Sequence, residues 1–444
     1  MTAAVLLLLA TWLEGDLAAA RRALEAGRPA EALRLLGDLA EREDADPRAL
    51  LVAGRARLAL GDPSAALDPL LRAAEKLPDD VEVARTTAGA CYRTAVSSPG
   101  VTHAALLHDA LRFAGRAQDP WLQALIEEEL GRHERALERY AAAGEAGHDA
   151  LDVWEGSARC LKALGRADWK EAYGKALELA IERRDFVRAW AVAFAADAGG
   201  RLLQWLDAEV AEAPEAFLPR RWRGFARARL LLFEGAIEDL RRATALRPDD
   251  VAARRELVGA LLRRYPAVRE PALLREAERE AQRLLRERPE DREIRRQLHW
   301  AARRRFEAGD PERAMELLRF LYDIEPLDLD VALGLAALSR RAGATDEADR
   351  IYRALLEAFP DEPDVLNDLA ILRDGLGDRA GAVKLWNAAV REDPEHLDAL
   401  ENLFTAAWER GDRGAARRWA ALGLRAAELQ EVAVDRWKWF SDRL

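Results

Sequence analysis

The chain has 444 residues and a formal net charge of −11, and 33% of its residues are charged and 50% hydrophobic. An acidic chain disfavours nucleic acid as the main partner, and this hydrophobic content excludes general intrinsic disorder. Abundant Ala, Leu, Glu and Arg without a strand pattern predict long amphipathic helices.

Residues 1–16 contain an apolar run, TAAVLLLLATWL. The run is too short to cross a bilayer, which needs about 20 residues. It also has no Lys or Arg before Arg21, unlike the basic start of a secretory signal. We expect an N-terminal helix packed on the first repeat. The alternative is that Met1 marks an artificial start and that an anchor or signal precedes it.

Residues 17–216 consist of paired amphipathic segments of varying regularity. Segment 47–80 is the most regular, and Ala32 precedes Ala66 by 34 residues. The match weakens in four segments, namely 81–116, 117–150, 151–182 and 183–216. SSPGVTH in the first of them predicts an inserted loop, and AGG separates two apolar helices in the last.

Cys91 and Cys160 fall two units apart, so they are expected to be buried free thiols.

Residues 217–305 form a basic central region. They contain 24 Arg against 14 Asp or Glu, a balance of +10, whereas the remainder carries −21. Segment 217–250 fits the spacing with Gly224, Ala236 and Pro248. The stretch RRYPAVREPALL then predicts an insertion near 264–274, between the two helices of the next unit.

Residues 295–430 show the clearest period, illustrated by GDRAGAVKLWNAAVREDP at 377–394. Gly309, Gly343, Gly377 and Gly411 are 34 residues apart, and so are Ala314, Ala348, Ala382 and Ala416. A period of this length indicates stacked supersecondary units. Each unit is expected to be two helices separated by glycine, with small residues where the helices cross and proline at the end.

The last segment, 431–444, predicts a capping helix whose Trp437, Trp439 and Phe440 cover the open end of the stack. About twelve helical hairpins are expected over residues 17–430.

No phosphate loop, nucleophile elbow or metal-spaced Cys and His motif occurs, so an enzyme is not expected. No cofactor and no metal site is predicted.

The spacing resembles the tetratricopeptide repeat family. In residues 363–396 the family pattern is carried by Leu366, Leu369, Ala370, Gly377, Ala382, Trp386, Ala389 and Pro394. The resemblance implies an all-α, right-handed α-solenoid superhelix. It also implies that the first helix of each hairpin lines an inner, concave wall, where an extended peptide or a partner helix lies.

On that wall, helical spacing in the basic region selects nine candidate partner-binding residues. They are Arg221, Trp222, Arg229, Arg255, Arg263, Arg296, His299, Trp300 and Arg303. Guanidinium groups offer paired donors to carboxylates, and indole rings offer flat apolar faces, so an acidic peptide is the expected ligand. The competing interpretation is codon bias, because 62 of the 68 basic residues are Arg.

The leading hypothesis is a non-catalytic scaffold for a protein or peptide partner, located in the cytoplasm of a bacterium. One alternative is a periplasmic or membrane-associated assembly subunit of an envelope or polysaccharide-secretion machine. A second is an RNA-binding helical-repeat protein, which the net charge disfavours. The asparagine-dependent carboxylate clamp of the family is doubtful here, because Asn367 and Asn402 do not recur and have acidic neighbours.

Overall fold

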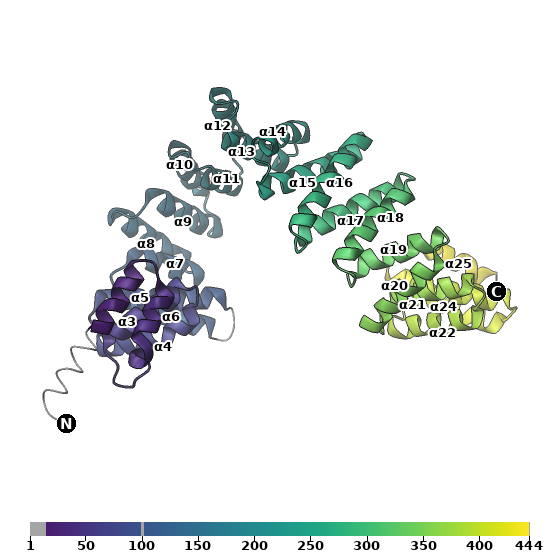
Figure 1. Ribbon diagram of the computed structural model, residues 1–444, viewed down its shortest axis with the longest axis horizontal. Helices are drawn as coiled ribbons and strands as arrows, with labels where there is room; N and C mark the ends of the chain where they lie inside the picture. The colour runs from purple at the N-terminus through teal and green to yellow at the C-terminus, as the bar shows by residue number, and fades with distance from the viewer. Residues whose placement is uncertain (1–14, 99–101, 444) are drawn as a thin grey trace. The chain divides into compact units, whose positions relative to one another are not determined.

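The computed structural model describes residues 15–98 and 102–443. Within these ranges the protein consists of α-helices and one short 3-10 helix, with no strand. It divides into two compact units, Met1–Pro214 and Glu215–Leu444. Each unit is a stack of helical hairpins (Figure 1). None of the helices in the described ranges is long and apolar enough to cross a membrane.

Unit 1 contains the following elements after helical residues 15–25: α2 (Pro29–Leu36), the 3-10 helix η1 (Gly37–Ala40), α3 (Pro47–Ala59), α4 (Pro63–Lys76), α5 (Val81–Ser97), α6 (His103–Arg116), α7 (Pro120–Glu129), α8 (His133–Glu145), α9 (Ala150–Ala163), α10 (Trp169–Glu182), α11 (Phe186–Ala195) and α12 (Gly199–Glu212). The break expected at AGG is confirmed between α11 and α12. The loop expected at SSPGVTH lies partly outside the described residues.

Unit 2 contains α13 (Phe217–Arg229), α14 (Phe233–Leu246), α15 (Val251–Val268), α16 (Pro271–Glu287), α17 (Arg292–Glu307), α18 (Pro311–Ile324), α19 (Leu329–Arg341), α20 (Thr345–Ala358), α21 (Pro363–Gly375), α22 (Arg379–Glu392), α23 (Leu397–Glu409), α24 (Arg413–Leu429) and α25 (Val434–Asp442). Helices α3 to α24 form eleven successive hairpins, and α2 completes a twelfth with residues 15–25. The predicted α-solenoid of about twelve hairpins is therefore confirmed.

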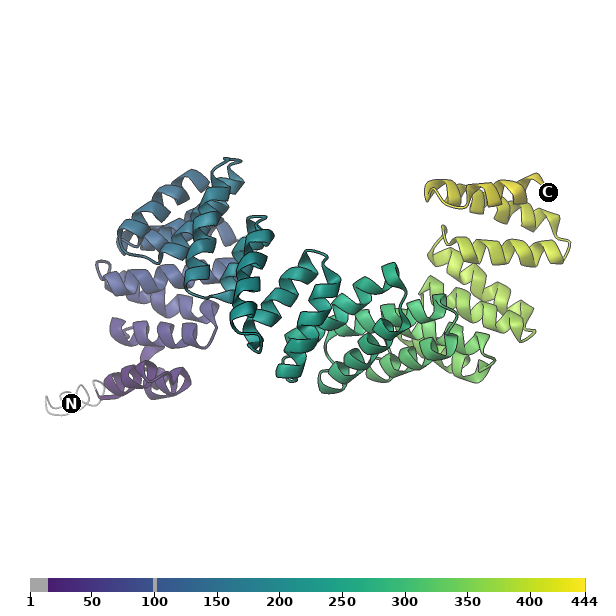
Figure 2. The ribbon, with the colours of Figure 1, turned by 90° about the horizontal axis from the view of Figure 1, so that it is seen from above.

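Helices adjacent in sequence are adjacent in space within each unit, as the colour order in Figure 2 shows. We call the odd-numbered members α3 to α23 first helices and the even-numbered members α4 to α24 second helices. Several consecutive first helices contact one another directly, for example α13 with α15 and α15 with α17, whereas consecutive second helices do not do so to a comparable extent. The first helices therefore lie on the inner side of the stack's curvature in each unit.

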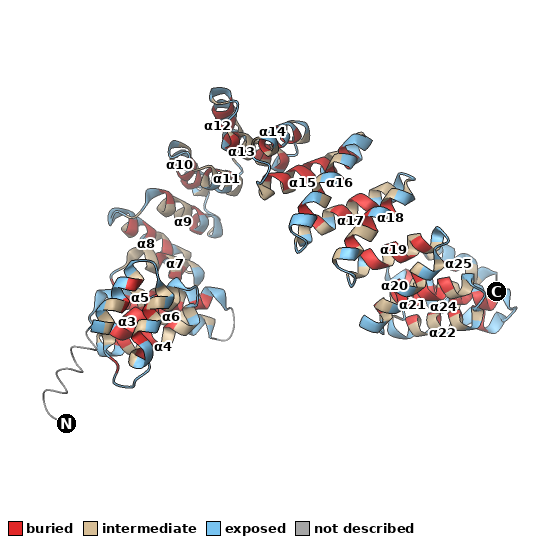
Figure 3. Ribbon diagram, viewed as in Figure 1, coloured by how far each residue is buried: buried red, intermediate tan, exposed pale blue. Residues whose placement is uncertain are grey.

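The core is distributed along the stack rather than gathered in one centre (Figure 3). Ala336 and Ala370 on first helices, and Ala348 and Ala382 on second helices, are each 0% exposed. Side chains this small let two helices approach closely, so the predicted close crossings are confirmed. Because each hairpin packs only on its neighbours, the same small residues must recur in every unit.

Aspartate begins many of the helices. The Asp310 carboxylate, for example, accepts the N–H of Arg313 at the start of α18, and Pro311 occupies the first turn, where its missing N–H costs nothing. At the turn inside each hairpin, glycine usually adopts positive φ. Leu231 replaces it between α13 and α14 with φ of 63°. A leucine in this region is strained, because its Cβ crowds the backbone.

The extra residues predicted near 264–274 lie in the longer α15 and α16, which have 18 and 17 residues and are joined by a short connection around Arg269. One expectation needs correction. The capping helix is present as α25, but its aromatic residues are used unequally. Trp437 is 1% exposed against α24, whereas Trp439 is 50% exposed. The apolar helix predicted for residues 1–16 lies outside the described residues, apart from helical Gly15 and Asp16.

Candidate functional site

A pocket of about 780 Å³ opens on the first-helix face of unit 2, between α15 and α17. Four of the nine predicted residues line it together, namely Arg255, Arg263, Arg296 and Trp300. Its other lining residues are Glu256, Gly259, Leu262, Pro266, Glu293 and Gln297. We call this the α15–α17 pocket. The family resemblance and helical spacing together thus selected residues up to 45 positions apart that line one pocket.

Each arginine of the α15–α17 pocket already has an acidic partner. Arg255 pairs with Asp291, at the start of α17. Arg263 pairs with Glu256 at 2.5 Å and also donates to the Gly259 carbonyl at 3.1 Å. A ligand carboxylate would therefore have to displace a protein carboxylate from each guanidinium group.

The third pair of the pocket joins Arg296 to Glu293, one turn apart on α17. The hydrogen bond from Arg296 holds the pKa of Glu293 below its ordinary value. Both groups are therefore charged at neutral pH. The Arg296 side chain remains 79% exposed, so solvent or a ligand can reach it.

Gln297 lies beside this pair and also lines the pocket. Its Nε2 donates to Glu293 at 3.1 Å, but its Oε1 is buried without a hydrogen-bond partner. The Nε of Arg255 is likewise buried and unpartnered. Buried polar atoms without a partner are costly, so the pocket has hydrogen-bonding capacity that a ligand can use.

The remaining predicted residues lie outside the pocket lining. On α13, the Arg221 guanidinium lies 5.2 Å from the centre of the Trp222 ring and pairs with Asp250 at 3.5 Å. Trp222 in turn contacts Phe225, with ring centres 5.4 Å apart. Arg221 and Trp222 therefore pack against each other and their neighbours.

The other three outlying residues are Arg229, His299 and Arg303. Arg229 is exposed at the end of α13, and His299 is half-buried on α17. Arg303 pairs with Glu307 at 3.2 Å on the same helix. The structure does not bring these three to the α15–α17 pocket.

Much of the arginine excess in residues 217–305 has a structural use. The Asp239 carboxylate, 0% exposed on α14, accepts from Arg223 at 2.6 and 2.8 Å and from Arg227 at 2.8 Å, with Arg220 at 3.4 Å. We call these four residues the Asp239 cage. Buried Glu278 on α16 is held similarly by Arg305 at 2.6 Å. These arginines hold helices together, which neither codon bias nor partner binding explains.

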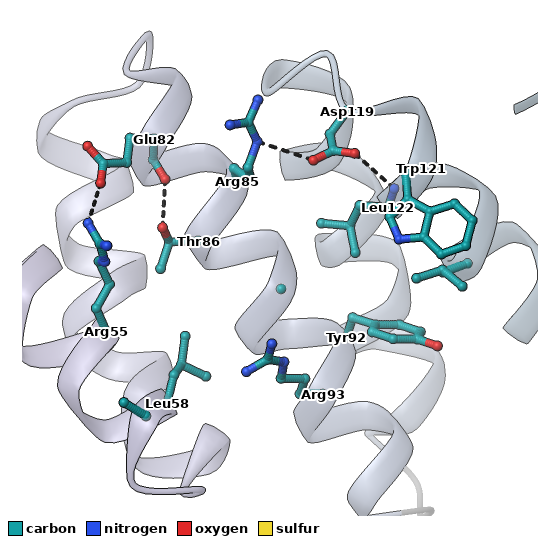
Figure 4. Close-up of a pocket in the computed structure, with 13 residues that line it drawn as sticks. Arg55, Leu58, Glu82, Arg85, Thr86, Tyr92, Arg93, Asp119, Trp121 and Leu122 are labelled. Carbon is teal, nitrogen blue, oxygen red and sulfur yellow. Dashed lines mark hydrogen bonds and ion pairs between the residues drawn. The ribbon is translucent and has the colours of Figure 1, made fainter. Parts of the chain in front are cut away.

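Unit 1 carries a second pocket of about 780 Å³ on its own first-helix face, between α3, α5 and α7 (Figure 4). Arg55 pairs with Glu82, and Arg85 pairs with Asp119 at 3.2 Å, on either side of the opening. Tyr92, Trp121, Leu58, Leu122 and Leu125 supply its apolar lining. Sequence analysis did not find this pocket, because this part of the chain has no excess of basic over acidic residues or the reverse. Its lining residues nevertheless lie on first helices, as those of the α15–α17 pocket do.

The two cysteines are both free and buried, as predicted. Burial raises the pKa of the Cys91 and Cys160 thiols to about 12. Both thiols are therefore protonated at neutral pH and are poor nucleophiles. Neither is part of a reactive site.

The helical repeats have recognisable relatives. The family model described as tetratricopeptide repeat matches residues 23–88 and 305–370. The chain contains tetratricopeptide repeats. A comparison with curated proteins returned no significant match. The second matched segment runs from the end of α17 through α18, α19 and α20 into α21.

Several solved structures are similar at low identity. MamA is 16% identical, with 37% of this chain and 94% of that chain covered and a TM-score of 0.31. YrrB, described as having an unusual peptide-binding site, is 17% identical, with 44% and 96% covered and a TM-score of 0.34. A tetratricopeptide repeat protein from Parabacteroides merdae is 14% identical, with 58% and 97% covered and a TM-score of 0.33.

Proposed function

We propose that the protein is a non-catalytic scaffold whose first-helix face in unit 2 binds a protein or peptide partner. The observation that carries this proposal is the α15–α17 pocket, where Arg263, Arg296 and Trp300 meet on the inner side of the stack. Tetratricopeptide repeats support a scaffold role, since partner binding is their usual activity. The pocket adds a specific place for the contact.

An acidic segment is the partner chemistry that the pocket favours. The protein carboxylates that pair with Arg263 and Arg296 are themselves accessible, with Glu256 34% and Glu293 44% exposed. They can swing into solvent while a ligand carboxylate takes the guanidinium fork, which keeps the cost of exchange small. Trp300 provides an apolar face beside them, part of which Arg304 covers at 4.6 Å.

The test is a double charge reversal, Arg263→Glu with Arg296→Glu, assayed with a fluorescein-labelled Glu-rich peptide. We expect the Kd to rise by about tenfold or more at low salt, because two attractive charges become repulsive. The matched control is Arg275→Glu with Arg279→Glu, on the exposed side of α16. If both doubles weaken binding equally, or neither does, the pocket assignment is refuted.

We also propose that the protein acts in the cytoplasm. Two buried free thiols support a reducing compartment, where unpaired cysteines persist without forming disulfides. Cell fractionation of the native host, with an antibody against the chain, tests this location. Recovery in the periplasm or with membranes would refute it.

A further inference from the structure

The pocket of unit 1 is lined by three successive first helices, α3, α5 and α7, and we call it the α3–α7 pocket. Figure 4 shows Leu58 on one side and Tyr92 with Trp121 on the other, with Arg93 between them. At a helix spacing of about 10 Å, the opening extends about 20 Å across the three helices. An extended chain covers that length with about six residues, so the opening suits a protein segment.

Gly89 lines this pocket from the middle of α5, a helix of 17 residues. Glycine inside a helix is unfavourable relative to alanine, because it loses more backbone freedom on folding. Packing explains Gly54 and Gly156 elsewhere in unit 1, since a Cβ on either would collide with a neighbouring side chain. A Cβ on Gly89 would meet nothing within 4 Å outside its own stretch of helix. A ligand that approaches the backbone of α5 closely would explain why glycine occurs here.

The indole ring of Trp121 is fixed by contacts outside the pocket lining. It stacks on His148, with ring centres 3.9 Å apart and an angle of 17° between the planes. It also contacts the buried Tyr140, with ring centres 5.4 Å apart. An apolar group that binds against Trp121 therefore has to order no further side chain there, which lowers the entropic cost of binding.

The charges of the α3–α7 pocket leave one cation unmatched. Arg55 pairs with Glu82. Arg85 pairs with Asp119 at 3.2 Å, and the same carboxylate caps α7. Arg93 is exposed, and no carboxylate oxygen lies within 4.0 Å of its side-chain nitrogens among residues 15–98 and 102–443. Three arginines and two acids thus line the pocket, and the excess positive charge complements a carboxylate.

We propose that the α3–α7 pocket binds a protein segment that carries a bulky apolar side chain and, two residues later, a carboxylate. The apolar side chain lies over Gly89 against Tyr92 and Trp121, and the carboxylate pairs with Arg93. Gly89 and Arg93 are four residues apart on α5, which is about 6 Å along the helix. Two residues of extended chain cover about that distance and direct both side chains to the same face.

This inference goes beyond the proposed function, because it concerns unit 1 and uses no residue of the α15–α17 pocket. The two pockets also favour different ligands. The α15–α17 pocket offers three guanidinium groups to an acidic segment, whereas the α3–α7 pocket offers a fixed aromatic wall and one unpaired guanidinium group.

The test uses an acetylated and amidated peptide, Ser-Gly-Phe-Ser-Glu-Gly-Ser, with para-fluorophenylalanine as its aromatic residue. Titration followed by fluorine NMR gives its Kd for the full chain. We expect Arg93→Glu to raise the Kd at low salt by about tenfold, because an attractive charge becomes repulsive. The matched control is Arg139→Glu, another exposed arginine, on the second helix α8. No binding to the native protein, or equal effects of the two substitutions, would overturn the proposal.

Gly89→Leu should change stability and binding in opposite directions. Leucine forms helix more readily than glycine and finds open space here, so the melting temperature should rise. Its side chain fills the volume that the ligand needs, so the Kd should rise by about tenfold or more. Gly115→Leu, near the end of the second helix α6, is the control and should leave the Kd unchanged. Native affinity in Gly89→Leu would refute the assigned pocket.

The variant Arg263→Glu with Arg296→Glu separates this inference from the proposed function. It should bind the fluorinated peptide as tightly as the native protein does. If the Kd rises in this double variant and not in Arg93→Glu, the peptide occupies the α15–α17 pocket, so the present inference fails and the proposed function stands. If Glu-rich peptide binding ignores Arg263 and Arg296 while the fluorinated peptide depends on Arg93, the proposed function fails and the α3–α7 pocket stands.

Discussion

Arg223 of α13 holds the buried carboxylate of Asp239 with two parallel hydrogen bonds, at 2.8 Å from Nε and 2.6 Å from Nη2. The pair joins the two helices of one hairpin at the start of unit 2. Bidentate geometry of this kind fixes both the distance and the rotation between the helices.

Asp239→Ala should therefore be strongly destabilising. The change leaves the partly buried guanidinium groups of the Asp239 cage without their shared acceptor, and we expect a loss of about 3 to 5 kcal/mol in the free energy of unfolding. Urea unfolding followed by far-UV circular dichroism measures it. The control is Asp249→Ala, in the exposed turn before α15. Equal effects of the two changes would mean that the cage adds no net stability.

Leu231 offers a test of backbone strain. Leu231→Gly should stabilise the protein by about 0.5 to 1 kcal/mol, because glycine tolerates the φ of 63° and the leucine side chain is 69% exposed. The reciprocal change, Gly377→Leu at a φ of 90°, should cost about 1 to 2 kcal/mol. Thermal melts of both variants check this. A destabilised Leu231→Gly would show that Leu231 makes contacts worth more than its strain.

Gly423 controls the docking of α25. A Cβ built on Gly423 would lie 2.2 Å from the Trp437 ring, so Gly423→Ala should displace α25 at a cost of about 1 to 3 kcal/mol. Faster proteolysis at the α24–α25 connection and a changed near-UV spectrum are the expected signs. Gly414→Ala on the same helix is the control, since its Cβ would meet nothing closer than 3.6 Å. Identical digestion of both variants would contradict the assigned packing.

Asp368 should make stability depend on pH in an identifiable direction. Burial raises its pKa above the ordinary value of 3.8, so the folded state favours the protonated form. The stability that this group contributes is complete below 3.8 and is lost as the pH rises through the raised pKa. Asp368→Asn should therefore be more stable than the native protein at pH 7, and the difference should shrink at acid pH. Urea unfolding at both pH values measures it, and a constant difference would be contrary to this expectation.

The hairpins could be predicted because their spacing depends on local chemistry. Glycine at the turn, alanine at the crossing and aspartate before the helix each act within a few residues. Gly377, Asp378 and Ala382 together therefore predict one hairpin from the sequence. The extra residues near 264–274 could be placed from the sequence, but not their helical form, because proline is unfavourable inside a helix. In the structure Pro266 lies in the last turn of α15, where its missing N–H removes only one hydrogen bond.

The candidate site could be predicted only in part. Helical spacing identified which side chains of α15 and α17 face the inner wall, since that is a property of each helix. It could not pair Arg255 with Asp291, 36 residues away, because such a pair depends on how two hairpins stack.

The Asp239 cage also has a consequence for synthesis on the ribosome. All of its members lie between Arg220 and Asp239, so the hairpin of α13 and α14 can satisfy its buried carboxylate as soon as α14 has emerged from the exit tunnel. Glu278 must instead wait for Arg305 and Arg313, which are translated later. At about 5 to 20 residues per second, the 35 residues from Glu278 to Arg313 take about 2 to 7 seconds to translate. The vectorial order of translation therefore makes α13–α14 a self-sufficient platform on which the later hairpins of unit 2 assemble.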